Sequence, residues 1–216
     1  MYLTKEMTMT ALRSMKSFHD DLLKCFEVHS LSLEDNPGRR NAYLSHAQEV
    51  FFARELAKNF PLARCDGRSG KADIVIPEIS CELECKLTTP SSSGSINFQA
   101  YGESFGNNKK DFLYVIADSD FSHFAVLHFH GLTREDFGES LPSSQGKVKM
   151  KKQLTFSKCN VLHGSYSPNS VEQLSKIESK LSLTKKSTQA YQKLLERKAY
   201  WQDASNESFS IKMSPA

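Results

Sequence analysis

Two neighbouring stretches of the chain decide the fold: Gly67-Arg68-Ser69-Gly70-Lys71-Ala72-Asp73-Ile74-Val75-Ile76 and Cys81-Glu82-Leu83-Glu84-Cys85-Lys86-Leu87. The side chains of a strand point alternately to its two faces. The second stretch, as a strand, puts Glu82, Glu84 and Lys86 on one face and its cysteines and leucines on the other. Because Pro77-Glu78 between the stretches is typical of a turn, we predict a hairpin of strands 72–76 and 80–88.

Charged groups on one face of an otherwise apolar strand are costly unless they pair or bind a metal. The hairpin can bring Asp73 beside Glu84. Mg²⁺ prefers oxygen ligands and is typically held by one or two carboxylates together with water and substrate phosphates. Asp73 and Glu84 would supply those carboxylates, and Lys86 could orient a water. The alternative is a salt-bridged cluster on a solvent-facing strand.

The pattern of Asp73, ten intervening residues and Glu84-Cys85-Lys86 resembles the PD-(D/E)xK phosphodiesterase superfamily, most closely a type II restriction endonuclease. Ala72 stands where the family has its leading Pro. The resemblance covers roughly residues 44–130. It implies a metal-dependent phosphodiester hydrolase in which Asp73, Glu84 and Lys86 are catalytic and Mg²⁺, replaceable by Mn²⁺, is the cofactor.

The resemblance also implies two further site residues. The family tends to carry a Glu on an upstream helix, and Glu49 fits that position as a metal ligand better than Glu55 does. A polar residue after the Glu-x-Lys strand often contributes, and Gln99 resembles it. The alternative is that Glu49 lies on the solvent-facing side of its helix and that Gln99 is a surface residue. Glu82 shares the face of Glu84 and is a rival ligand in a shifted register.

The remaining periodicity predicts an α/β (α+β) fold, a mixed β-sheet flanked by helices with a restriction-endonuclease-like core. We predict one nuclease domain over 1–216, with its core at about 41–135 and a C-terminal basic strand and helical region at 146–205. The other predicted elements are helices at 5–27, 41–59, 95–105, 170–182 and 187–203, strands at 112–117 and 124–130, and a basic strand or hairpin at 147–158.

Basic residues lie where a polyanionic partner would need them. Lys147, Lys149 and Lys151 alternate, so a strand presents them on one face. Arg68, Lys71, Lys109 and Lys110 lie nearer the proposed site and are candidates for gripping the scissile strand of double-stranded DNA. The net charge of +3 by itself proves no such partner.

Several classes of protein are disfavoured. No apolar stretch is long enough to span a bilayer, and Met1 to Leu12 does not resemble a secretory signal. Five scattered cysteines favour free thiols in a cytoplasmic protein over a structural zinc site. No phosphate-binding loop is present, so no nucleotide cofactor is expected. His128 and His130 would share a strand face, either as a metal pair or as an exposed surface.

These patterns favour an Mg²⁺-dependent DNA endonuclease. Its size, without other domains, favours a type II restriction enzyme that cuts a palindromic duplex site as a homodimer. The alternatives are a structure-selective repair or junction nuclease of the same superfamily and a DNA-binding protein without catalytic activity.

Overall fold

The structure is a computed structural model of the chain. It describes residues 1–33, 36–66, 68, 71–91, 96–105, 109–139, 146–151, 155–166, 177–178, 180–186, 188–203 and 211–216. The chain divides into two compact units. The first comprises Met1–Gly164 and Met213–Ala216, and the second comprises Ser165–Lys212. The predicted core of 41–135 lies within the first unit, whereas the single domain over 1–216 stays a prediction.

Two long helices begin at identifiable caps. Helix α1, Lys5–Val28, follows Thr4, whose side chain accepts a hydrogen bond from the Met7 N–H. Helix α2, Pro37–Ala57, follows Asn36, whose side chain accepts from the Arg39 N–H. Such caps satisfy backbone donors that have no partner inside the helix. The predicted helix 5–27 is thus confirmed. The helix predicted at 41–59 begins earlier, because Asn36-Pro37 is a helix cap and first turn.

The main sheet belongs to the first unit and is mixed, which confirms the predicted α/β fold. Among the described residues its seven strands run in the order β1-β2-β3-β5-β6-β11, and β8 also pairs with β6. Strands β3 and β5 are parallel, and the other pairs are antiparallel. The strands are β1 Arg64–Cys65, β2 Ile74–Ile76, β3 Cys81–Thr88, β5 Lys110–Ala117, β6 His123–Leu132, β8 Cys159–His163 and β11 Ser214–Pro215.

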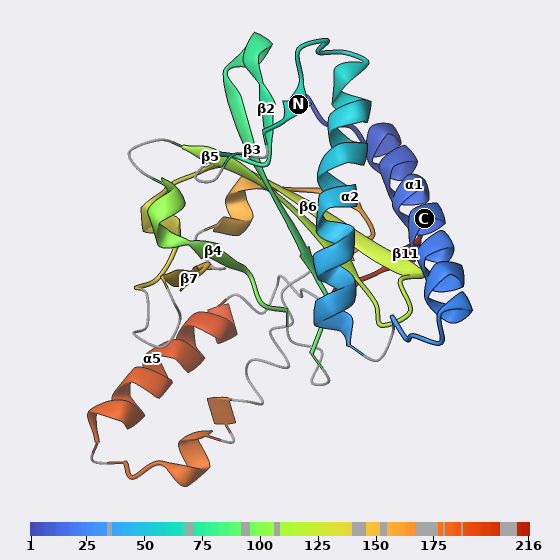
Figure 1. Cartoon of the computed structure of the whole chain (residues 1–216). Helices are drawn as coiled ribbons and strands as arrows, with labels where there is room; N and C mark the ends of the chain where they lie inside the picture. The colour runs from blue at the N-terminus through green and yellow to red at the C-terminus, as the bar shows by residue number, and fades with distance from the viewer. Residues whose placement is uncertain are drawn as a thin grey trace. The chain divides into compact units, whose positions relative to one another are not determined.

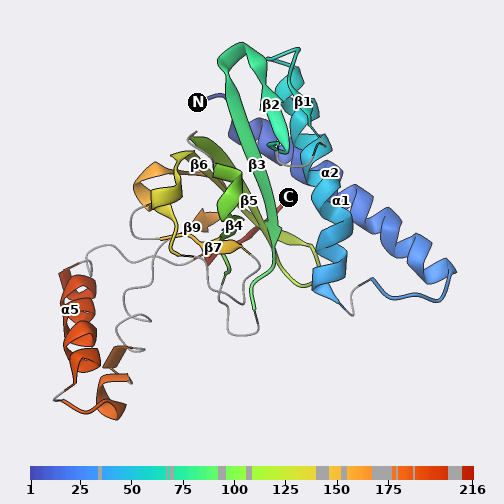
Figure 2. The ribbon, with the colours of Figure 1, turned by 60° about the vertical axis from the view of Figure 1, so that its left-hand side comes forward.

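The main sheet is covered on both faces. Figures 1 and 2 show α1 and α2 side by side along one face, where Leu83, Leu113 and Val126 belong to the same apolar core as the inner sides of the helices. The opposite face carries an aromatic cluster in which Phe98 packs against Tyr114 and Phe129. Both cores consist of buried apolar side chains, and their burial is the main contribution to stability.

A small second sheet lies on the aromatic side. It pairs β4, Gln99–Tyr101, with β7, Lys147–Lys149. The helix predicted at 95–105 is wrong here, because Ile96, Phe98 and Ala100 are buried while the residues between them are not. That period of two is the pattern of a strand. A short 3-10 helix, η2 Gly102–Phe105, follows it.

The basic segment predicted at 147–158 begins as a strand, β7. Val148 and Met150 are buried, and Lys149 and Lys151 are exposed on the alternate positions. Residues 152–154 lie outside the described part. The segment ends in the 3-10 helix η5, Phe156–Lys158. Two other 3-10 helices are η1, Pro77–Ile79, inside the hairpin, and η3, Arg134–Asp136, after β6.

The second unit contains helix α5, Gln189–Asp203, and the short strands β9, Ser165–Tyr166, and β10, Ile211–Lys212, which pair antiparallel. Helix α5 confirms the helix predicted at 187–203. Most of the helix predicted at 170–182 lies outside the described residues. None of the helices in the described part of the chain combines the length and the apolar character that a membrane span requires.

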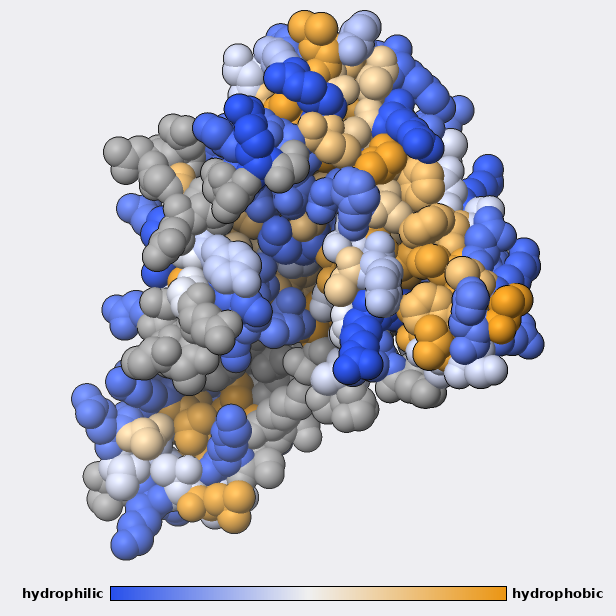
Figure 3. All heavy atoms as spheres, viewed as in Figure 1, coloured by the Kyte–Doolittle hydropathy of each residue, from blue (hydrophilic) through white to orange (hydrophobic). Residues whose placement is uncertain are grey.

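Large apolar side chains remain on the outer side of the two long helices. Phe18 of α1 is 38% exposed and Tyr43 of α2 is 54% exposed. Figure 3 shows apolar residues gathered on the surface over these helices.

Candidate active site

The predicted hairpin is present and places Asp73 opposite Glu84. Strand β2 pairs antiparallel with β3, and Ile74 lies opposite Leu83. Asp73, immediately before β2, therefore stands level with Glu84. The Cys85 N–H donates to Asp73 Oδ2 at 2.7 Å, which fixes the Asp73 side chain against β3. The two carboxylates come together through the register of one hairpin.

The ammonium group of Lys86 lies between these carboxylates. Its Nζ is 3.5 Å from Asp73 Oδ2 and 3.2 Å from Glu84 Oε2. Lys86 follows Glu84 by two positions on β3, so both side chains project from the same face. The side chains of Asp73 and Lys86 are 27% and 29% exposed, whereas that of Glu84 is 9% exposed. Solvent, and any substrate, can therefore approach from the side of Asp73 and Lys86.

Lys110 has a different position from the one expected of it. We predicted that Lys110 grips DNA, but its side chain is only 5% exposed. Its Nζ lies 3.3 Å from Glu84 Oε1 and 3.3 Å from Glu82 Oε2. The parallel pairing of β3 with β5 brings it there, since Leu83 lies opposite Asp111 and Glu84 opposite Phe112. Lys110 is thus a buried counter-ion of the two glutamates, and its ammonium does not face a surface ligand.

Glu49 approaches the hairpin from α2. Its side chain is 21% exposed and lies 3.4 Å from His46 Nδ1. Burial, and next the charge of Asp73, raises the pKa of Glu49 above its usual value. The charge of Lys86 lowers the pKa of Glu49, so Glu49 is within electrostatic range of the hairpin charges. Glu55, the rejected alternative, instead pairs with Lys58 on its own helix.

The remaining charges of the site respond to burial and to one another. Burial raises the pKa of Asp73, and Glu84 adds to this while Lys86 opposes it. Burial alone lowers the pKa of Lys86, but the Asp73 and Glu84 carboxylates outweigh it and hold that pKa above its ordinary value. An excess of carboxylates over ammonium groups surrounds the site, with Glu49, Asp73, Glu82 and Glu84 against Lys86 and Lys110. A bound cation would offset that excess.

Gln99 lies on β4, in the layer that covers the face of the main sheet from which Glu84 and Lys86 project. Its backbone carbonyl accepts a hydrogen bond from the Tyr114 hydroxyl at 3.0 Å. Tyr114 pairs with Lys86 across the β3–β5 ladder. The described contact of Gln99 thus runs through its backbone, and a catalytic role for its side chain stays a prediction.

The other residues predicted to bind DNA are on the surface. Lys71, Lys109, Lys149 and Lys151 are exposed, and Lys147 is half-buried. Arg68 is exposed but forms hydrogen bonds with Asp66, including one of 2.7 Å from its Nε. The loop glycines Gly67 and Gly70 lie outside the described residues.

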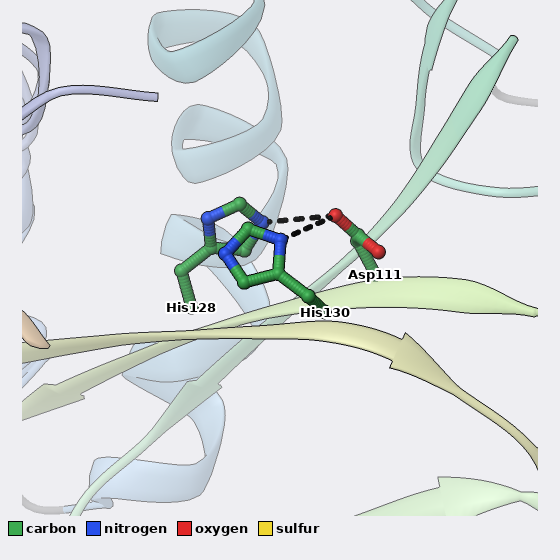
Figure 4. Close-up of side chains that lie close together, drawn as sticks. All are labelled: Asp111, His128 and His130. Carbon is green, nitrogen blue, oxygen red and sulfur yellow. Dashed lines mark hydrogen bonds and ion pairs between the residues drawn. The ribbon is translucent and has the colours of Figure 1, made fainter. Parts of the chain in front are cut away.

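Only the two histidines of a second polar cluster were anticipated from the sequence. Asp111 of β5 lies beside His128 and His130 of β6, and Figure 4 shows both rings turned toward its carboxylate. Among the described residues, this is the only group of three or more His, Cys, Asp or Glu with donor atoms all within 4.8 Å of one another. The alternation of His128 and His130 was recognised, but His128 is fully buried and so is not on an exposed strand face. The sequence around Asp111 does not predict that it lies near the histidines, because strand pairing brings them together.

A comparison of the sequence with protein-family models found no match, and a comparison with curated proteins found none either. The roles proposed below therefore depend on the residues and contacts of this chain.

Proposed function

We propose that this chain is a metal-dependent phosphodiester hydrolase that cuts double-stranded DNA at the β2–β3 hairpin. One observation carries the proposal: Asp73 and Glu84 face each other across the hairpin, with the Lys86 ammonium 3.5 Å and 3.2 Å from their oxygens. An ordinary salt bridge needs one carboxylate for each ammonium. Here three acids, Asp73, Glu82 and Glu84, share the two ammonium groups of Lys86 and Lys110 at a position that is partly open to solvent. A further acid, Glu49 of α2, is close enough for the charges of Asp73 and Lys86 to act on its pKa.

The donor set fits Mg²⁺. Asp73, Glu84 and Glu49 offer hard carboxylate oxygens, and Mn²⁺ accepts the same ligands. When bound, such an ion polarises the scissile phosphate and lowers the pKa of a coordinated water. The donor atoms of these three acids do not all lie within 4.8 Å of one another, and the Lys86 ammonium contacts both Asp73 and Glu84. Binding of an ion would therefore move the Lys86 ammonium aside.

The residues of the chain have separate tasks in this proposal. Asp73 and Glu84 hold the ion, with Glu49 as a third ligand. Lys86, once displaced from the carboxylates, stays close enough to orient the attacking water and to stabilise the charge that develops on the phosphate. Lys110 remains buried against Glu84 and orients that carboxylate.

The DNA-binding surface is proposed from the exposed basic residues. Lys71 and Lys109 each precede a strand of the site, and Lys149 and Lys151 project from the β7 region. Phosphate contacts of this kind position the duplex without reading its sequence. We further propose a type II restriction enzyme that acts as a homodimer, because two symmetry-related sites suit the two cuts in a palindrome.

The test is cleavage of a sequenced supercoiled plasmid by the purified full chain with Mg²⁺, Mn²⁺ or EDTA. We expect discrete fragments with either metal and none with EDTA. Asp73→Asn should slow cleavage at least about a hundredfold, since it removes a metal ligand and the charge beside Lys86. The matched control is Asp21→Asn, because Asp21 is an exposed residue of α1 that pairs with exposed Lys24.

The outcomes separate the alternatives. Cleavage that survives Asp73→Asn contradicts the site, and an intact plasmid with every metal favours a DNA-binding protein without catalysis. Fragments with one set of mapped ends support the restriction enzyme, whereas cutting confined to branched substrates supports a junction nuclease. Sedimentation of the protein with and without a palindromic duplex tests the homodimer.

A further inference from the structure

The cluster of Asp111, His128 and His130 lies on the opposite face of the main sheet from Glu84. Asp111 is opposite Leu83 on the β3–β5 ladder, and Leu83 belongs to the core beneath α1 and α2. Glu84, the next residue, points the other way. The cluster is therefore separate from the hairpin site and has its own chemistry.

A local irregularity of the sheet aims the three side chains at one point. The β5–β6 register shifts between Lys110 and Phe112, which leaves Asp111 outside the regular ladder. Gly131 has φ +58°, in the left-handed region that favours glycine, and its N–H donates to Asp111 Oδ1 at 2.7 Å. That hydrogen bond holds one carboxylate oxygen and directs the other, Oδ2, at the two histidines. Such bulges commonly re-aim side chains at functional positions.

The distances match the edges of a metal coordination shell. Asp111 Oδ2 is 3.3 Å from His128 Nε2 and 3.1 Å from His130 Nδ1. Two ligands of a tetrahedral ion with bonds of about 2.0–2.1 Å are about 3.3–3.4 Å apart. Figure 4 shows both nitrogens directed at the same oxygen from one side. A small shift of the rings would thus admit an ion at the centre of the three donor atoms.

A fourth group completes the surroundings. The hydroxyl of Tyr2, which precedes α1, lies 2.8 Å from Asp111 Oδ2 and 2.9 Å from His128 Nε2. It occupies the position of a fourth ligand, or of a water that it would orient. The amide of Asn160 contacts the far nitrogen of His130 at 2.7 Å. Outer contacts of this type fix the orientation of a metal-binding imidazole.

We propose that Asp111, His128 and His130 bind a divalent transition-metal ion of the Zn²⁺ class, with the Tyr2 hydroxyl at the fourth position. Two imidazoles and one carboxylate suit Zn²⁺, Co²⁺ or Ni²⁺, whereas Mg²⁺ and Ca²⁺ prefer oxygen ligands alone. Bound there, the ion links β5, β6 and the segment before α1. It would connect the segment before α1 to β5 and β6 of the main sheet. This role is structural and independent of the proposed DNA cleavage.

The test is titration of the metal-stripped full chain with Zn²⁺ by calorimetry, with Co²⁺ as the spectroscopic probe. We expect one equivalent to bind at this site, with the visible absorption of tetrahedral Co²⁺ and a higher melting temperature, separate from any ion that the hairpin carboxylates take up. Asp111→Asn and His130→Gln should each weaken binding by at least about tenfold to a hundredfold. Both are suitable variants, because an asparagine side chain can still accept the hydrogen bond from the Gly131 N–H and the His130 side chain is partly exposed.

Two controls isolate this site. His123→Gln changes an exposed histidine at the start of β6, and Asp73→Asn removes a hairpin ligand. Both should keep the Co²⁺ spectrum, and loss of cleavage in Asp73→Asn with full Zn²⁺ binding would show that the two proposals stand separately. The proposal is overturned if Asp111→Asn and His130→Gln bind as tightly as wild type while folded by circular dichroism. A strong thiolate-to-cobalt band, which would assign the ion to cysteines, also overturns it.

Discussion

Lys110→Met, compared with Lys109→Met, tests the charge balance on which the hairpin site depends. The two lysines are adjacent, but Lys109 is exposed while Lys110 is 5% exposed and lies between Glu82 and Glu84. Methionine keeps much of the apolar stem and removes the ammonium. The comparison therefore isolates one buried charge against a matched surface charge.

The magnitude follows from the burial of the partners. Removing one member of a fully buried ion pair costs about 3–5 kcal/mol, because the other charge stays buried without compensation. Glu82 is 39% exposed and can be solvated, and Glu84 keeps Lys86 at 3.2 Å. Both effects reduce the cost, so we expect Lys110→Met to lower the free energy of unfolding by about 2–3 kcal/mol. Lys109→Met should stay within about 0.5 kcal/mol of wild type.

Urea denaturation followed by circular dichroism measures both variants. With a slope of about 1–3 kcal/mol per molar urea, the expected loss shifts the midpoint of Lys110→Met by about 0.7–3 M. Combining Lys110→Met with Glu84→Gln should cost less than the sum of the single changes, since the double variant leaves no charge at position 84 to be compensated. Equal midpoints for Lys109→Met and Lys110→Met would refute the buried counter-ion.

Two further predictions concern other charges of the first unit. Asp136 accepts hydrogen bonds from Lys158 Nζ at 2.8 Å and from the Thr133 N–H at 2.8 Å. Burial raises the pKa of Asp136, but these hydrogen bonds outweigh burial and hold that pKa below its usual value. Ionised Asp136 therefore stabilises the folded state above the unfolded pKa of about 3.9, and this stabilisation is lost as the pH falls further. The difference in melting temperature between Asp136→Asn and wild type should shrink below about pH 4. A constant difference from pH 7 to pH 3 contradicts this. Lys149→Gln should reduce the slope of log affinity for DNA against log salt by about one, as expected for one lost phosphate contact, and Lys24→Gln on α1 should leave the slope unchanged.

The hairpin was predictable because the residues that determine it are close together in the sequence. The alternation from Cys81 to Leu87 assigns each side chain to a face, and the turn at Pro77 fixes which residues of the two strands meet. The opposition of Asp73 and Glu84 followed from these two facts. The approach of Glu49 from α2 followed only from the family resemblance, and the structure places it near Asp73.

The misread residues of the two polar clusters owe their positions to pairings between distant parts of the chain. Lys110 looks like a surface lysine beside Lys109 until β5 is set parallel to β3, which places it against Glu84. The Asp111 cluster depends on a bulge between β5 and β6 and on Tyr2 at the other end of the chain. Hydrophobic periodicity does not predict the register between two strands that are not joined by a short turn.

The path of the chain makes the second unit a closed loop. The chain leaves the first unit after Gly164 and returns at Met213, and β11 then joins the edge of β6 with Ser214 opposite Phe124. The His163 side chain also contacts the Ser214 carbonyl at 3.0 Å, so the two ends of the loop are fastened together. The entropy lost on closing such a loop grows only with the logarithm of its length, by about 0.6 kcal/mol for each doubling. A change in the length of Ser165–Lys212 should therefore cost the main sheet little, as long as β11 and His163 keep the two ends of the loop together.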